Sequence, residues 1–149
     1  MAKKPQLKLV LTFLLFAGGA QAWAECTAWH HRGAMVAARE RAGPSISFAH
    51  ASYDPDGWPA ITYGPVFYEM PRLMQEFTKL HECMHLNMHT NDEVRANCEA
   101  LLALRRRGLT PADEESIARY HVKFPQMAAQ YGGSGHAFWT ATIECAGQR

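Results

Sequence analysis

Two histidines and a glutamate stand close together near the middle of the chain, in the pattern His-Glu-x-x-His formed by His81, Glu82 and His85. Apolar residues recur every three or four positions from Leu73 to Met88, which predicts an amphipathic helix through this segment. On such a helix the two histidines project from one side, where two neutral imidazoles can bind one Zn²⁺ at about 2.0–2.1 Å. Glu82 lies roughly 100° further round the helix. We expect it to take a proton from water activated by the metal.

A catalytic zinc site usually has three protein ligands and one open position, so a third ligand is needed. The nearby candidates are His89, Asn91, Glu93 and Glu99. On a straight helix the Cα atom of His89 would lie about 12 Å from that of His81, too far for both to bind one ion. We therefore expect His89 to cap the helix or to hydrogen-bond a ligand.

The choice between the two glutamates follows from the helix face that each occupies. Glu93 lies at the border of the apolar stripe of the next predicted helix, with Asn97 one turn above it. Glu99 lies among arginines on the polar side, where solvated ion pairs contribute little. We predict that Glu93 is the third ligand; the alternative is a first-turn acid stabilised by the helix dipole.

These motifs resemble those of gluzincin metallopeptidases. Residues 93–97 (EVRAN) are similar to the family's Glu-x-x-Ala-Asp motif, and residues 81–89 resemble small exported relatives that carry His-Glu-Cys-x-His followed by Gly-His. The resemblance covers residues 60–104, with a weaker similarity at Gly135-His136. It implies a minigluzincin-like core of a small sheet, the metal-binding helix and the glutamate helix. The substrate-aligning strand of that family would fall at residues 60–63 or 66–68.

The chain departs from the family pattern in two ways. Asn97 replaces the aspartate that orients a ligand histidine; an amide can accept the same hydrogen bond but carries no charge. The turn between the two helices is also short. Zincins that use a third histidine place it six residues after the second, and that position is Asn91 here.

The resemblance and the residues together indicate an exported zinc-dependent peptidase in which Glu82 is the general base. His136 is the first candidate for the donor that stabilises the oxyanion, because it follows a glycine-rich loop. Tyr131 and His121 are weaker candidates. One alternative is a non-catalytic module, stabilised by zinc, that binds a peptide or a protein. A structural protein without a metal is the other; the carboxylate of Glu82 argues against a purely structural site.

The first 24 residues have the features of a secretory signal peptide. Three lysines precede the short apolar run Leu9–Ala17, and Ala22-Trp23-Ala24 forms a small-x-small cleavage site, with a cut after Ala22 as the alternative. The apolar run is shorter than the roughly 20 residues that a membrane span needs. Cleavage leaves residues 25–149 as a single metallopeptidase-like domain. We expect a periplasmic or secreted protein that does not contact the membrane after cleavage.

The four cysteines all follow the predicted cleavage site, and an even number in an oxidising compartment indicates two disulfides. Three pairings are possible. We favour Cys83–Cys98, which would join the two metal-binding helices, and Cys26–Cys145, which would join the two ends of the domain. A zinc ribbon is the rival interpretation, but the sequence contains no Cys-x₂-Cys pair.

The elements expected before the metal-binding helix are one helix and a small sheet. Residues 25–42 look helical, residues 45–49 and 60–63 look like strands, and residues 54–57 (DPDG) form a turn. Residues 66–68 are expected to continue in extended conformation. The predicted fold class is α+β: a mainly helical, zincin-like core with a small sheet packed beside the metal-binding helix.

Three helices are expected from the metal-binding residues onward. The first runs from Pro71 to His89, the second from its N-cap Asn91 to Arg107, and the third starts at its N-cap Thr110. Residues 136–145 are either a helix or a strand. The formal charge of +1 becomes −2 without the three leader lysines, which argues against a nucleic-acid surface. A peptide or protein substrate is the expected partner, and nothing in the sequence sets the oligomeric state.

Overall fold

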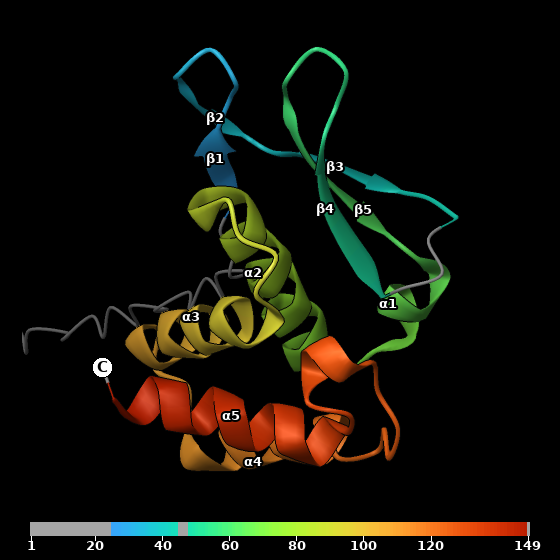
Figure 1. Ribbon diagram of the computed structural model, residues 1–149, viewed down its shortest axis with the longest axis vertical. Helices are drawn as coiled ribbons and strands as arrows, with labels where there is room; N and C mark the ends of the chain where they lie inside the picture. Colours follow the sequence, from blue (N-terminus) through green and yellow to red (C-terminus); the bar gives the residue numbers. More distant parts are fainter. Residues whose placement is uncertain (1–24, 45–47, 149) are drawn as a thin grey trace, which may run out of the picture.

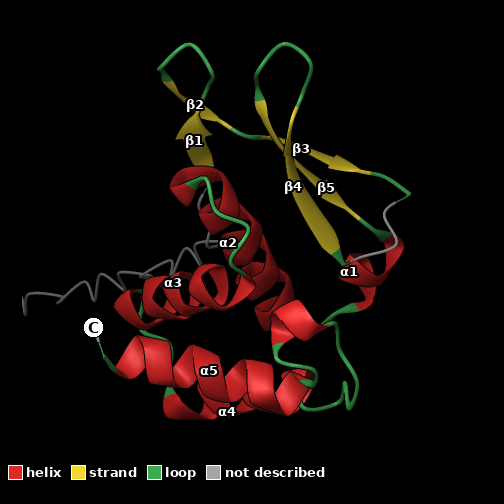
Figure 2. Ribbon diagram, viewed as in Figure 1, coloured by secondary structure: helices red, strands yellow, loops and turns green. Residues whose placement is uncertain are grey.

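Strands and helices occupy separate parts of this molecule (Figure 2). The computed structural model describes residues 25–44 and 48–148, so the predicted signal peptide at 1–24 lies outside the described residues. The strands are β1 (Thr27–Trp29), β2 (Met35–Ala37), β3 (Arg39–Ala42), β4 (Ala49–Tyr53) and β5 (Pro59–Tyr63). The helices are α1 (Pro65–Glu69), α2 (Arg72–Met88), α3 (Glu93–Arg106), α4 (Pro111–His121) and α5 (Gly135–Gly147), with a 3₁₀ turn at Ala129–Tyr131. The predicted α+β class is confirmed.

β5 is the central strand of a three-stranded sheet, paired in parallel with β3 and antiparallel with β4. Its Ala60 and Ile61 are fully buried, as expected for a strand covered on both faces. β4 forms one edge of the sheet and packs beside α2 (Figure 1). The strand predicted at 60–63 and the turn at 54–57 are confirmed. The strand predicted at 45–49 falls partly on residues 45–47, outside the described residues, and the observed strand begins at Ala49.

The helix predicted at 25–42 is wrong, because this segment forms three short strands. β1 and β2 form an antiparallel hairpin, and β3 joins β5. Alanine, arginine and glutamate have high helix propensity, but pairing with a buried strand outweighs that local preference. Asp54 anchors β3 through contacts of 3.0 Å with Arg39 and 2.7 Å with Arg41. Gly43-Pro44, predicted to stop that helix, instead follows the end of a strand, since β3 ends at Ala42.

α2 has close to its predicted bounds, with Pro71 as the N-cap rather than the first helical residue. It ends at Met88, and its C-cap His89 has a left-handed backbone at φ 47° and ψ 47°, where the chain turns back toward α3. The N-cap of α3 is Asp92 rather than Asn91. The Asp92 side chain accepts a hydrogen bond of 3.0 Å from the backbone N–H of Arg95.

The remaining helices have clear local starts. Thr110 caps α4 as predicted and forms a capping box with Asp113. Residues 66–68 are helical rather than extended, because they follow Pro65 in the first turn of α1. Residues 136–145, expected to be either a helix or a strand, lie in the helix α5. Its N-cap Ser134 accepts a hydrogen bond of 3.1 Å from the backbone N–H of Ala137.

α2 lies between two hydrophobic clusters. The cluster against the other helices includes Met74, Phe77, Leu80, Leu101 and Ile117. The cluster against the strands includes Ala28, Ile61, Tyr63, Cys83 and Leu86. Burial of each large side chain stabilises the fold by about 1.5–3 kcal/mol. Because both faces of α2 are packed in this way, the side chains along the border between the clusters have fixed positions.

The disulfides are Cys26–Cys83 and Cys98–Cys145, so both predicted pairings are wrong. Cys83 belongs to the strand-side cluster, whereas Cys98 belongs to the helix-side cluster, and the two side chains therefore point in different directions. Each bridge instead joins one of the two central helices to a terminal segment: α2 to the residue before β1, and α3 to α5. Loops of 57 and 47 residues correspond to about 4 kcal/mol of chain-entropy stabilisation each.

Candidate metal centre

α2 and α3 bring the three predicted ligands together. His81 and His85 lie one turn apart on α2, and Glu93 is the first residue of α3, which packs against α2. The ligand atoms of the three side chains all lie within 4.8 Å of one another. Among the described residues, no other group of histidine, cysteine and carboxylate side chains meets this criterion. The sequence prediction therefore finds the candidate site that the fold provides.

The distances within this triad are short and nearly equal. Glu93 Oε2 is 3.0 Å from His81 Nε2 and 3.2 Å from His85 Nε2, and the two Nε2 atoms are 3.0 Å apart. Ligands of a tetrahedral zinc ion, with bonds of about 2.0–2.1 Å, lie roughly 3.3 Å from one another. The triad thus has close to the separations that three ligands of one such ion require.

Each imidazole is oriented through its other nitrogen. His85 Nδ1 lies 2.7 Å from the carbonyl oxygen of Thr90, which can only accept, so Nδ1 carries the proton. His81 Nδ1 lies 3.1 Å from Asn97 Oδ1, and if that oxygen accepts, Nδ1 again carries the proton. Both rings are then protonated at Nδ1 and present the lone pair of Nε2 to Glu93. This is the tautomer in which Nε2 can bind a metal.

Thr142 determines which atom of the Asn97 amide faces His81. Thr142 Oγ1 donates its only proton to the carbonyl oxygen of Phe138 at 2.9 Å, so it accepts from Asn97 Nδ2, also at 2.9 Å. Asn97 Oδ1 consequently faces His81 and accepts its proton. Asn97 and Thr142 are 1% and 0% exposed, so bulk water does not compete for these bonds. Thr142 comes from α5, and no local sequence pattern connects it with Asn97.

Two lone pairs and a carboxylate repel one another unless positive charge lies among them. Without a metal ion, protons supply that charge. Burial alone would raise the pKa of Glu93, but hydrogen bonds from His81 and His85 outweigh burial and lower that pKa to about 2. Burial alone would lower the pKa of His85, but hydrogen bonds to Glu93 and Thr90 outweigh it and raise that pKa. Two imidazoles and a carboxylate are donors that zinc prefers, and a divalent cation can replace the protons.

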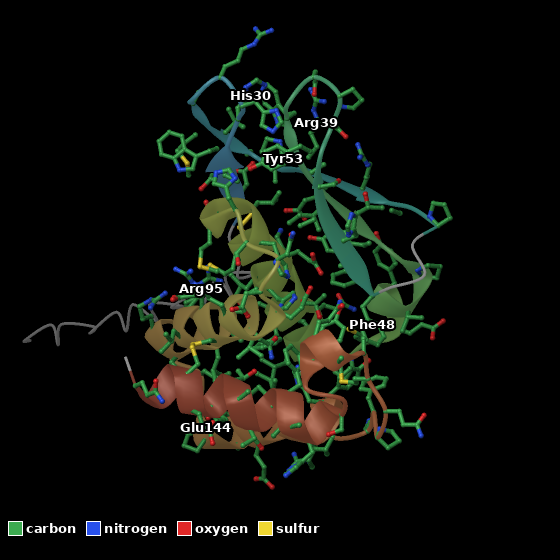
Figure 3. All side chains as sticks on the ribbon, in the orientation of Figure 1. His30, Arg39, Phe48, Tyr53, Arg95 and Glu144 are labelled. Carbon is green, nitrogen blue, oxygen red and sulfur yellow. A yellow bond between two sulfur atoms is a disulfide. The ribbon has the colours of Figure 1, made fainter. Side chains whose placement is uncertain are left out.

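The triad lies in the wall of a cavity of about 530 Å³, within the range of roughly 300–1,000 Å³ for ligand pockets. His50 and Ala51 of the edge strand β4 line it, together with Tyr131 of the 3₁₀ turn. Phe48 stands immediately before β4, at the end nearer the helices (Figure 3), and its ring centroid is 5.5 Å from that of Phe124. The cavity therefore lies between the edge of the sheet and the helical part of the molecule.

Two further polar side chains share this cavity with the triad. Glu82 lines it and is only 8% exposed, next to the ligand His81 in the chain. Tyr131 lines it as well; burial first, and then the negative charge of Glu93, raises its pKa. Tyr131 consequently keeps its phenolic proton at neutral pH and is a hydrogen-bond donor.

Two of the predicted histidines lie away from the triad. His89 stacks on Tyr53 with ring centroids 6.1 Å apart, toward the strand end of the molecule, where Figure 3 labels Tyr53. Its Nδ1 is 3.4 Å from Tyr53 Oη, and His89 caps α2 through its backbone N–H, which donates to the carbonyl oxygen of His85. His136 is exposed at the start of α5 and is not among the residues that line the cavity. The structure brings Tyr131 and His121 to the cavity instead.

No protein-family model matches this chain, and neither a curated protein nor a solved structure matches it. The likeness to gluzincins rests on residues 81–89 and 93–97 and stays a prediction. The structure itself shows a His-His-Glu group that could hold a metal ion and two disulfides, which suit an oxidising, exported environment. None of the helices in the described part of the chain combines the length and apolarity that a membrane span requires.

Proposed function

We propose that this protein is an exported, zinc-dependent peptidase with a gluzincin-type ligand set. The observation that carries the proposal is the convergence of His81, His85 and Glu93 in the wall of a cavity that also holds the buried carboxylate of Glu82. Two imidazoles and one carboxylate are the protein ligands of many catalytic zinc sites, whereas calcium and magnesium prefer oxygen ligands. A purely structural site would have no use for Glu82.

Four polar groups around the triad have proposed roles in peptide hydrolysis. Held by His81, His85 and Glu93, zinc would supply a Lewis acid that lowers the pKa of water toward about 7. Glu82 accepts a proton from the attacking water and passes it to the leaving amine. Thr90 and Asn97 accept the Nδ1 protons and so keep both Nε2 atoms available as ligands. Tyr131 donates a hydrogen bond to the oxyanion that develops on the substrate carbonyl, the role first expected of His136.

The strand that we propose for aligning the substrate is neither of the two segments expected from the sequence, residues 60–63 and 66–68. β5, which contains residues 60–63, is paired on both of its edges, and residues 66–68 are in α1. β4 is an edge strand, and its His50 and Ala51 line the cavity. An extended peptide can add to such an edge through main-chain hydrogen bonds. We therefore place the substrate along β4.

The Glu82→Gln variant tests the enzyme assignment. Peptide hydrolysis should fall at least roughly 100-fold, because the amide cannot act as a general base, while the zinc content stays at one per chain. The measurement pairs metal analysis of the purified protein with cleavage of a mixed peptide library. Glu76→Gln is a matched control on the same helix; its carboxylate is 37% exposed and pairs with Arg107 at 3.6 Å. The control should retain both properties.

The outcomes separate the proposed peptidase from its two alternatives. Zinc binding by wild type and Glu82→Gln alike, with no cleavage by either, would favour a zinc-stabilised binding module. Wild-type protein that neither contains nor takes up zinc would favour a structural protein without a metal. Equal cleavage by wild type and Glu82→Gln would remove Glu82 from the mechanism.

A further inference from the structure

One buried polar group interrupts the apolar part of the cavity. His121, the last residue of α4, lines the cavity and is 9% exposed. Aromatic rings surround its imidazole: the ring centroids of Trp139, Phe77 and Phe138 lie 5.0, 5.5 and 5.8 Å away. A polar atom in such a setting needs a hydrogen-bond partner, because its desolvation is otherwise uncompensated.

The hydrogen bond at Nδ1 fixes the tautomer of this ring. Nδ1 lies 2.9 Å from the carbonyl oxygen of Ile117, which only accepts, so Nδ1 carries a proton. Burial lowers the pKa of His121 to about 4, so the ring is neutral near pH 7. Nε2 therefore has a lone pair and no proton. His121 cannot donate to an oxyanion, which removes it from the candidates for that role.

No described residue donates a hydrogen bond to Nε2 of His121. In the same part of the chain, every fully enclosed side-chain nitrogen or oxygen has a partner. An unpaired Nε2 must then be accessible, and His121 is one of the residues that line the cavity. Nε2 of His121 is thus a fixed acceptor in the apolar part of the cavity, to which a ligand can donate a hydrogen bond.

We propose that His121 makes this part of the cavity selective for a tyrosine or tryptophan side chain of the substrate, by accepting a hydrogen bond from its O–H or N–H group at Nε2. The inference rests on the proposed peptidase function and names its substrate class. Aromatic walls fit a flat ring, and Tyr and Trp are the aromatic residues whose polar end requires a partner when buried. Lysine also has a donor, but its charge would lose hydration among these rings.

Phenylalanine would fill the same space and leave the acceptor unpaired. Sites built to hydrogen-bond a substrate reject the analogue that lacks the group much more strongly than a purely apolar pocket can. The expected discrimination is roughly 10- to 100-fold, which corresponds to one buried, unsatisfied polar atom.

Binding can be measured without any catalytic step in the zinc-loaded Glu82→Gln variant. The probes are short peptides, blocked at both ends, that are identical except for one residue: tyrosine, tryptophan, phenylalanine or O-methyltyrosine. Titration calorimetry should give at least about tenfold tighter binding for tyrosine or tryptophan than for phenylalanine and O-methyltyrosine. O-methyltyrosine is the matched probe, since it keeps the ring and the oxygen but has no donor.

The His121→Phe variant supplies the second arm, because it keeps an aromatic ring and removes the acceptor. It should bind the phenylalanine peptide at least as tightly as the parent does, because no acceptor is left unpaired, and it should lose the preference for tyrosine or tryptophan. Equal binding of tyrosine and O-methyltyrosine peptides by the parent would overturn the proposal, whether or not His121→Phe folds. So would a preference that persists in a folded His121→Phe, or the absence of binding by all four peptides. If the preference holds in binding but wild type cleaves none of the peptides, the peptidase assignment fails and the pocket assignment stands.

Discussion

Thr142→Val should weaken zinc binding although Thr142 touches no ligand. Valine has nearly the shape of threonine, so packing at this fully buried position is kept while both hydrogen bonds of the hydroxyl are lost. The Asn97 Nδ2 group, 1% exposed, is then left without an acceptor, at a cost of about 1–3 kcal/mol. The amide also loses its orientation. If it rotates, Nδ2 faces His81, Nδ1 must accept, and the proton moves to the Nε2 atom that should bind zinc.

Loss of a partner that orients a ligand histidine typically weakens metal affinity by roughly 10- to 100-fold. The assay is zinc competition against a chelator of known affinity, together with the nitrogen chemical shifts of His81, which report the tautomer. Thr142→Ser is the matched control: it keeps the hydroxyl and removes a methyl group, and it should retain zinc affinity within a few-fold.

A particular pattern of results would refute this reasoning. If Thr142→Val is less stable than wild type but binds zinc equally well, the orientation of the Asn97 amide has no influence on the ligand. If Thr142→Ser and Thr142→Val weaken zinc binding equally, packing of the methyl group matters and the hydrogen-bond chain does not.

Three more predictions concern protonation, catalysis and covalent structure. Zinc-free protein should lose up to about 3 kcal/mol of stability as the pH falls from 4.5 toward 2, since the pKa of Glu93 is about 2 in the folded chain and near 4.5 when unfolded. Urea titrations across this range should show a larger loss in wild type than in Glu93→Gln, because the lowered pKa values of Asp54, Asp56 and Asp113 contribute an acid-induced loss to both proteins. Tyr131→Phe should reduce kcat roughly 100-fold in peptide cleavage assays without changing zinc content, and an unchanged kcat would exclude it as the oxyanion donor. Replacing Cys98 and Cys145 together with alanine should cost about 4 kcal/mol in chemical unfolding, whereas a cost near zero would contradict the observed pairing.

The Asn97–Thr142 pair gives a physical reason for asparagine at the motif position. An amide has a donor and an acceptor on opposite sides, and here the donor meets Thr142 while the acceptor meets His81. A carboxylate would place a second acceptor against Thr142 Oγ1, whose proton already goes to Phe138. The asparagine is therefore matched to its neighbours in this fold, and the ligand histidine still receives an acceptor.

The convergence of the three candidate ligands could be predicted because their relationship is local. His81 and His85 are one helical turn apart, and the face of the next helix was enough to favour Glu93 over Glu99. The N-cap at Thr110 depends on adjacent residues and could be predicted from the sequence for the same reason. In each case the interactions that determine the structure join residues only a few positions apart in the sequence.

The predictions that proved wrong concern features determined by contacts between segments far apart in the sequence. Residues 25–42 have helix-forming side chains, but their pairing with β5 cannot be seen locally. The disulfide partners of Cys83 and Cys98 depend on which hydrophobic cluster each cysteine side chain faces. The part played by Thr142 requires α5 to lie against α3, and the glycine-rich loop that drew attention to His136 leaves that side chain in solvent.

The two disulfides close consecutive loops, Cys26–Cys83 and Cys98–Cys145, which neither overlap nor enclose one another. The short span between them carries His85 and Glu93, so the ion would sit at the joint of two covalently closed halves. Zinc would then act as a removable third cross-link. Its loss would loosen the joint, which carries two of the three candidate ligands, while both halves stay intact.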